Sequence, residues 1–254
     1  MLLALDVGNT NIVVGVFEAE QLVADFRIHT DERATGDELG LTLTDLLGRR
    51  RLGSQDIDGL IVANVVPALT RAVEEAALTY FGRPPMMVGP GIRTGVRILS
   101  YDPRQVGADR VANALAAYRA HGGPAIIVDF GTSTNFDVVG AEGEYLGGAI
   151  APGLEVSLEA LVSRAARLSR VELIVPDSAI GRATAASMQV GLVLGHIAMI
   201  EGLVARMRAE LGGTARTIGT GGLAATIAAH TTAIDVVDER LTLTGLRLIH
   251  EINR

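Results

Sequence analysis

Two stretches of the chain repeat one pattern, and their starts lie about 120 residues apart. The first runs from Leu3 to Phe17 and the second from Ile126 to Gly140. In each, an apolar run ends in Asp, a Gly follows among small hydroxyl or amide residues, and a second apolar run comes next. Two hydrophobic runs joined by a short Gly-containing connection predict a β-hairpin. The repeat indicates that each hairpin heads its own half of the chain.

The two predicted turns contain groups that suit phosphate. Glycine lets the backbone approach a ligand without a Cβ in the way. Backbone N–H groups and the hydroxyls of Thr10 and Thr132 can donate to phosphate oxygens, while Asp6 and Asp129 can hold a bridging cation. A single turn of this kind is most often only a hairpin, because Asp, Gly, Asn and Thr are ordinary turn residues. The second copy favours ligand binding.

A chain of 254 residues, 48% of them hydrophobic, suits one large domain or two smaller ones. The repeat favours two domains, residues 1–113 and 114–254. Each is predicted to begin with three antiparallel strands and to continue with helices and further strands. The first-half strands are expected at Leu2–Val7, Ile12–Phe17, Leu22–Ile28, Gly59–Ala63 and Met86–Val88, and the second-half strands at Ala125–Asp129, Thr134–Val139, Glu144–Ile150, Thr217–Ile218 and Ile234–Val237.

Composition excludes several classes of protein. The net charge of −7 leaves no positive excess for nucleic acid or an acidic membrane. No Cys is present, and the five His show no metal-ligand spacing, so a zinc site is not expected. All 22 basic residues are Arg, which excludes a Walker A lysine and any Schiff base. With no leader and no membrane span expected, the predicted location is the cytoplasm.

A third segment, Gly107-Ala-Asp-Arg110, precedes a predicted helix that ends at Gly122. Asp109 and Arg110 therefore lie near a helix N-terminus, where an ionised carboxylate and bound anions are both favoured. The alternative is that Asp109 is an ordinary acid of a first helical turn. Similarly, Gly221-Gly222 could let a nucleotide lie against the backbone, or could be a plain turn.

A long helix is predicted from about Thr184 to Leu211, with apolar residues on more than one face. One face can pack on the helix's own core and leave another, with Met199 expected on it, for a two-fold partner. The alternative is a core helix buried wholly within its own chain.

Taken together, Asp6-Val-Gly-Asn-Thr10, Gly107-Ala-Asp-Arg110, Asp129-Phe-Gly-Thr132 and Gly147-Gly-Ala-Ile-Ala-Pro-Gly153 resemble the type III pantothenate kinases. These kinases belong to the superfamily of acetate and sugar kinases, Hsp70 and actin. The resemblance implies an α/β fold of two similar actin-like, ribonuclease H-like domains, each a mixed sheet with flanking helices. It implies phosphorylation of pantothenate by ATP, the first step of coenzyme A synthesis.

The resemblance also implies roles for particular residues. Asp109 would be the general base, and Asp129 would bind a monovalent cation, K⁺ or NH₄⁺, beside the Mg²⁺ that accompanies ATP. Asp6 would act on Mg-ATP. The implied ATP contacts are Asp6, Val7, Gly8, Asn9, Thr10, Asn11, Ile12, Val13 and Thr132, and the implied pantothenate contacts are Tyr101, Gly107, Ala108, Asp109, Arg110 and Thr184. Thr184 would reach the site of a partner subunit, because the family is homodimeric.

Two other functions stay open at this point. The chain could be a kinase of the same superfamily with another small acceptor, such as a sugar or a carboxylic acid. It could also be a nucleotide-binding regulator without catalysis. The presence of Asp6, Asp109 and Asp129 argues against the regulator, because a binding module needs no proton acceptor.

Overall fold

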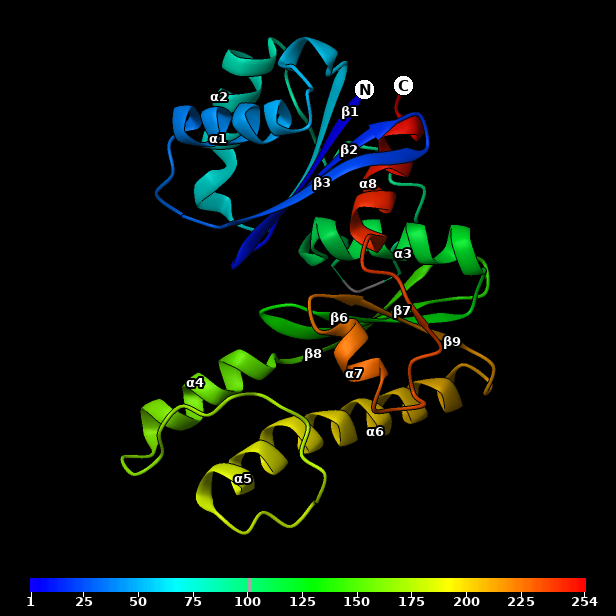
Figure 1. The fold of residues 1–254 in the computed structure, drawn as a ribbon. Coiled ribbons are helices and arrows are strands. Elements are labelled where there is room, and N and C mark those ends of the chain that lie inside the picture. The colour runs from blue at the N-terminus through cyan, green and yellow to red at the C-terminus, as the bar shows by residue number, and fades with distance from the viewer. Residues whose placement is uncertain (100–101) are drawn as a thin grey trace. The chain divides into compact units, whose positions relative to one another are not determined.

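The computed structural model describes residues 1–99 and 102–254 (Figure 1). The chain forms two compact units. The first contains Met1–Arg119 together with the C-terminal segment Arg240–Arg254, and the second contains Ala120–Glu239. Each unit has its own sheet and its own flanking helices.

The first unit has a five-stranded sheet in the order β3-β2-β1-β4-β5. β1 is antiparallel to β2 and parallel to β4, so the sheet is mixed. Its strands are β1 (Leu2–Val7), β2 (Asn11–Glu18), β3 (Gln21–His29), β4 (Gly59–Asn64) and β5 (Met86–Met87), and its α-helices are α1 (Gly36–Arg49), α2 (Thr70–Phe81), α3 (Ala108–His121) and α8 (Leu241–Ile252). Short 3₁₀ turns lie at Ser54–Asp56, Pro67–Leu69 and Pro103–Gln105.

The second unit has the sheet order β10-β9-β6-β7-β8. Its strands are β6 (Ala125–Phe130), β7 (Ser133–Val139), β8 (Tyr145–Pro152), β9 (Arg216–Gly221) and β10 (Val236–Val237), and its helices are α4 (Leu154–Arg164), α5 (Thr184–Gln189), the π-helical turn η4 (Val190–Leu194), α6 (Gly195–Glu210) and α7 (Ala224–Ala228). The two sheets have the same topology. β6 to β10 take the places of β1 to β5 in chain order, and each corresponding pair of strands runs in the same relative direction. The predicted duplication of an α/β fold is therefore confirmed.

The side chains of β1 point alternately to the two faces of the sheet, and helices cover both faces, so the first unit has three layers. Leu3, Leu5 and Val7 face the cluster that contains α1 and α2. Leu2 and Ala4 face the opposite cluster, with α3 and α8. Because successive side chains of a strand point to opposite faces, Asp6 belongs to the face covered by α3 and α8.

Helix limits in the first unit follow local capping. α1 begins at Gly36 because the Thr35 side chain accepts from the Glu38 N–H and Glu38 bonds back to the Thr35 N–H, a capping box that sequence analysis did not identify. α2 ends at Gly82, whose φ of 67° is the left-handed conformation that glycine adopts without strain. Pro67 is the first residue of a short 3₁₀ turn that leads directly into α2.

The compact units differ from the expected division into 1–113 and 114–254. Residue 113 lies inside α3, and α8 belongs to the first unit. Leu243, Leu246 and Ile249 of α8 are buried against β1 and β4. A Cβ on Gly245 would collide with the Ala112 carbonyl oxygen, so α8 lies directly against α3. This long-range return of the chain is not visible in local sequence patterns.

The long predicted helix consists of α5, η4 and α6 in direct succession. Among the described residues, only this stretch, Thr184–Glu210, is long and apolar enough to cross a membrane by length and composition alone. One of its faces, comprising Val193, Ile197, Ile200 and Val204, is buried against the second sheet. That packing is typical of a core helix.

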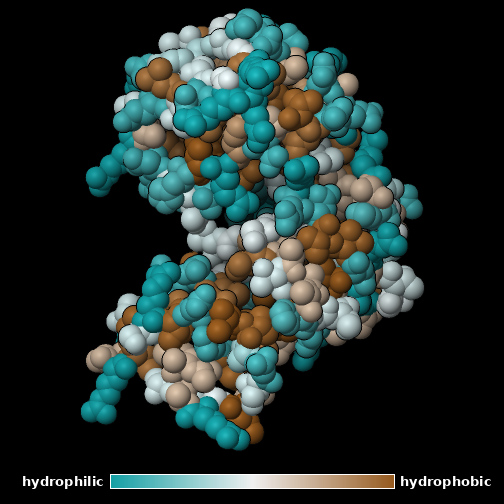
Figure 2. Space-filling model, viewed as in Figure 1, coloured by the Kyte–Doolittle hydropathy of each residue, from teal (hydrophilic) through white to brown (hydrophobic). Residues whose placement is uncertain are grey.

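Apolar side chains are also exposed on the second unit. Figure 2 shows hydrophobic atoms at the surface in the region of α4 and α5. The exposed large residues there and on β8 are Leu146, Ile150, Val156, Leu161, Ile174 and Ile180.

Candidate active site

The β1–β2 turn is built from Gly8 to Asn11. Gly8 N–H donates to the Asn11 carbonyl (3.1 Å), and Val7 and Ile12 are the last paired residues. Thr30, the residue after β3, makes two hydrogen bonds to the turn: its Oγ1 donates to the Gly8 carbonyl (2.6 Å) and its N–H to the Thr10 carbonyl (3.0 Å). These hydrogen bonds fix the backbone of the turn, while Asn9 and Thr10 are exposed. Such a turn can present amides and a hydroxyl to an anion.

Asp109 lies near a helix N-terminus, as predicted, but is already the second residue of α3 and is half-buried. Its Oδ1 accepts from the Arg110 N–H (2.9 Å). A Cβ at Gly107 would collide with this Oδ1 and would come within 3.6 Å of Val65 Cγ1. Glycine at position 107 thus leaves room for the carboxylate, and Val65 lies just beyond β4, where its N–H bonds to the Val7 carbonyl (3.0 Å).

The first unit brings Asp6 and Asp109 to the same end of the same face of its sheet. Asp6 pairs across β4 with Ala63, and both Ala63 and Ala108 belong to the cluster on the α3 face. The carboxylate of Asp109 lies near Val65, whose N–H bonds to the Val7 carbonyl just before the first turn, although about 100 residues separate Asp109 from that turn in sequence.

Burial changes the acidity of Asp109. Desolvation raises the pKa of this carboxyl above its ordinary value, and the Arg110 N–H and the Arg110 charge oppose the rise. A carboxylate with a raised pKa is a stronger base than a free one. The site thus contains a basic carboxylate at a helix N-terminus.

The second turn repeats the first with one residue fewer. Gly131 N–H donates to the Ser133 carbonyl (3.0 Å), and Phe130 and Thr134 are the last paired residues. Thr132 is exposed at the tip. Asp129 is half-buried and pairs with Asn135 on β7 and Thr220 on β9. The two hairpins, expected from the repeat, have the same construction.

Two glycines lie against the second turn, and sequence analysis connected neither of them with Asp129 or with the turn. A Cβ on Gly221, whose φ is 88°, would lie 2.7 Å from Asp129 Oδ1. A Cβ on Gly153 would lie 2.7 Å from the Gly131 carbonyl oxygen, and its N–H donates to the Thr132 carbonyl (3.1 Å). Glycine at position 221 therefore does more than form a turn, since only glycine leaves space for the Asp129 carboxylate.

A family model described as type III pantothenate kinase matches residues 2–206. The type III pantothenate kinase of Moorella thermoacetica is 49% identical over 253 residues, and that of Geobacter sulfurreducens is 49% identical over 254 residues. Each alignment covers 100% of this chain and 100% of the relative.

This chain belongs to the type III pantothenate kinase family.

Membership makes the chain a phosphotransferase, as the resemblance of its motifs implies. Two solved structures share the fold. A Campylobacter jejuni protein named for the Baf family of transcriptional activators has a TM-score of 0.63 at 19% identity and covers 99% of this chain and 98% of its own. An inorganic polyphosphate/ATP-glucomannokinase from Arthrobacter has a TM-score of 0.56 at 13% identity and covers 100% and 99%. The predicted actin-like kinase fold is confirmed.

The remaining residues assigned from the kinase resemblance lie as follows. Thr184 is the exposed first residue of α5, and Ala183, at the N-cap position, provides no side-chain hydrogen bond to the helix start. Arg110 follows Asp109 in the first turn of α3 and is half-buried. Tyr101 lies outside the described residues. Met199, expected toward a partner, is instead half-buried against its own core.

The Asp129 neighbourhood has donor atoms that suit a hard monovalent cation. Asp129 Oδ1 and the Phe130 carbonyl oxygen both lie close to the Gly221 Cα, since a Cβ there would come within 2.7 and 2.6 Å of them. Carboxylate and carbonyl oxygens are the ligands that hard cations prefer. Within the part of the chain that the structure describes, no cluster of three or more His, Cys, Asp or Glu could hold a metal ion.

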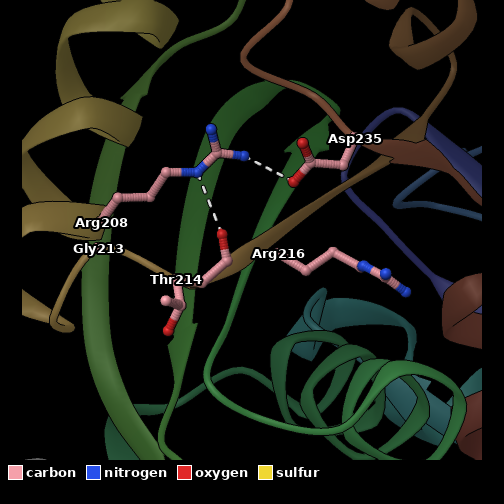
Figure 3. A pocket seen from close by; sticks show the side chains of 6 residues that line it. Arg208, Gly213, Thr214, Arg216 and Asp235 are labelled. Atoms are coloured by element: carbon pink, nitrogen blue, oxygen red, sulfur yellow. Dashed lines mark hydrogen bonds and ion pairs between the residues drawn. The ribbon is translucent and has the colours of Figure 1, made fainter.

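A separate polar pocket of about 340 Å³ lies at the other end of the second sheet (Figure 3). It is lined by Arg208, Gly213, Thr214, Ala215, Arg216 and Asp235. Arg216 pairs with Ala125 at the start of β6, whereas the second turn follows the end of β6. In Figure 3 the Arg216 side chain points away from Arg208, which is bound to Asp235 (2.6 Å) and the Ala215 carbonyl (3.1 Å). Polar groups that line this pocket therefore bond to one another and form a structural network.

Loss of this hydrogen-bond network should destabilise the fold. Asp235 Oδ2 accepts from the N–H of Thr217, a fully buried residue (2.7 Å), as well as from Arg208. Asp235→Ala should lower the free energy of unfolding by about 1–3 kcal/mol, because it leaves a buried N–H without its acceptor. Urea denaturation measures the change. Asp235→Asn, which retains an acceptor oxygen, should lose less, and an equal loss in both variants would contradict this account.

Proposed function

We propose that this chain transfers the γ-phosphoryl group of ATP to the primary hydroxyl of pantothenate, with Asp109 as the general base. The observation that carries the proposal is the Asp109 carboxylate, half-buried with a raised pKa at the start of α3, on the same sheet face as the first phosphate turn. Family membership supplies the substrate class.

The chemistry asked of the protein is positioning and charge neutralisation. In phosphoryl transfer the acceptor hydroxyl attacks in line, and its proton leaves late in the loose transition state. Asp109 would accept that proton as the new O–P bond forms and the bond to the ADP leaving oxygen breaks. Arg110, a planar donor fork, would pair with the pantothenate carboxylate or with phosphate.

Each turn is assigned to ATP phosphates. Residues Asp6 to Val13 would present amides and the Thr10 hydroxyl, with Asp6 acting on Mg-ATP. Thr132, exposed at the tip of the second turn, would donate to ATP. Asp129 would hold a monovalent cation, K⁺ or NH₄⁺, which supplies positive charge near the phosphates. ATP as substrate also supports a cytoplasmic location.

We further propose a homodimer through the exposed face of the long helix. That face is a row of small residues at helical spacing, namely Gly191, Gly195, Ala198, Gly202 and Ala205, and all are exposed. Small residues permit close approach of a second helix, and an identical helix related by a two-fold axis would present the same row. Thr184, at the start of this helix, would then face the pantothenate site of the partner.

Purified protein with ATP, Mg²⁺ and a panel of acceptors tests the proposed reaction. Pantothenate should give a phosphorylated product, and a sugar or a small carboxylic acid should not. Turnover of another acceptor with none of pantothenate would replace the substrate assignment, and binding of ATP with no transfer to any acceptor would favour a regulator.

The two turn carboxylates should differ in their response to cations. Asp129→Asn should blunt the dependence of the rate on K⁺, because it removes the anionic ligand, while Asp6→Asn should raise the Mg-ATP concentration needed for half-maximal rate. Initial rates over a K⁺ series and a Mg-ATP series measure both effects. A K⁺ response in Asp129→Asn equal to that of the parent would show that the monovalent cation binds elsewhere.

A further inference from the structure

A buried histidine lies directly beneath the second turn. His196 is in the first turn of α6 and is 7% exposed. Its Nε2 lies 3.0 Å from Oγ1 of Thr134, which is 1% exposed, and the donor of this hydrogen bond depends on the tautomer. The His196 ring also packs against the Phe130 ring, with centroids 6.5 Å apart and planes tilted by 54°.

The two partners of His196 are the residues that close the turn. Phe130 and Thr134 form the last pair between β6 and β7, and Gly131, Thr132 and Ser133 connect them. Both belong to the face of the sheet that packs on α6, whereas Asp129 points to the opposite face. His196 therefore contacts both sides of the hairpin at the point where the turn begins.

The helix that carries His196 is irregular just before it. The π-helical turn Val190–Leu194 ends two residues before His196, and π-turns inside helices occur frequently at functional sites. Burial lowers the pKa of His196, so the imidazole is neutral near pH 7 and the bond to Thr134 joins two neutral groups. A buried hydroxyl without this partner would be unsatisfied.

We propose that His196 is a positioning residue for ATP: through Thr134 and Phe130 it sets the height and tilt of the Gly131-Thr132-Ser133 turn. This inference rests on the proposed contact between Thr132 and ATP. His196 itself touches no reacting atom. A turn displaced by about 1 Å is enough to lower the rate of a transfer reaction substantially.

The test compares variants that remove either end of the hydrogen bond. His196→Leu and Thr134→Val should each raise the KM for ATP about tenfold and leave the KM for pantothenate within about twofold. His196→Gln, whose amide can reach the former Nε2 position, should recover most of the loss. The double variant should be no worse than either single variant, because both remove one interaction.

Tyr145→Phe is the matched control. It deletes another buried hydroxyl hydrogen bond, from Tyr145 to Asp137 (2.8 Å), at the end of the β7–β8 pair remote from the turn. It should lower the melting temperature and leave the KM for ATP unchanged. A general loss of stability would affect control and test variants alike, so the ATP-specific change separates positioning from folding.

The outcomes distinguish this inference from the proposed function. If Thr132→Val leaves ATP kinetics unchanged, the Thr132 hydroxyl does not contact ATP, and the proposed Thr132 contact and the inference that rests on it are both overturned. If Thr132→Val raises the KM for ATP and the folded His196→Leu and Thr134→Val variants do not, only the role of His196 is overturned. Should His196→Leu fail to fold, Thr134→Val alone decides, because valine retains the shape of threonine. Losses that add in the double variant also contradict the inference.

Discussion

Asp109→Asn should reduce turnover by about 10²- to 10⁴-fold, the usual effect of losing a general base. Asparagine keeps the shape of the side chain and an acceptor for the Arg110 N–H, but it cannot take a proton at neutral pH. ATP binding should persist, because Asp109 is assigned to the acceptor hydroxyl. Steady-state turnover and direct titration with an ATP analogue measure the two properties separately. Near-normal turnover in this variant would remove Asp109 from the mechanism.

The same substitution should also change the stability of the fold, in a direction that follows from the pKa shift of Asp109. The pKa of Asp109 is raised in the folded state, so the folded chain binds this proton more tightly than the unfolded chain does. The contribution of Asp109 to stability is therefore most favourable at low pH and is lost as the pH rises through the folded-state pKa. At neutral pH the buried charge destabilises the fold, so Asp109→Asn should unfold at an equal or higher urea concentration than the parent. A clearly less stable variant would contradict burial as the cause of the shift.

Gly202→Glu should convert the protein to folded monomers without kinase activity. Gly202 lies in the exposed small-residue row of the long helix, and a Cβ there meets nothing within 4 Å in its own chain. Within one subunit the change should be harmless or favourable, since Glu has a better helix propensity than Gly by roughly 0.5–1 kcal/mol. Across a two-fold interface it would place two like charges in a closely packed contact. Light scattering and the kinase assay at matched concentrations report the result.

Two variants control this experiment. Gly202→Ala adds only a methyl group and should retain most of the dimer. Gly48→Glu introduces the same charge at another exposed helical glycine, in α1, where a Cβ also meets nothing within 4 Å, and should leave mass and activity unchanged. Full activity in a monomeric Gly202→Glu protein would show that no residue of a partner is needed. Met199→Glu is a poorer choice than sequence alone suggests, because Met199 packs on its own core.

Local sequence patterns predicted most of the strands and helices, because these elements form largely through interactions between residues close in sequence. Alternation and hairpin turns placed β1 to β3 and β6 to β8 within one or two residues. β9 is longer than the expected Thr217–Ile218, since it runs from Arg216 to Gly221. Its extra residues are specified by parallel pairing with β6, a partner about 90 residues away, and not by their own β propensity.

The sequence by itself determined the two hairpin turns and the helix start near Asp109, because each depends on residues close to one another in the chain, and the recurrence of the hairpin indicated the duplicated fold. Tertiary structure alone decided which glycines make room for Asp129, where α8 packs, which face of the long helix is exposed, and that His196 supports the second turn. The physical reason is that these features depend on close approaches between segments far apart in the chain. A sequence records the residue at each end of such an approach but not the distance between them.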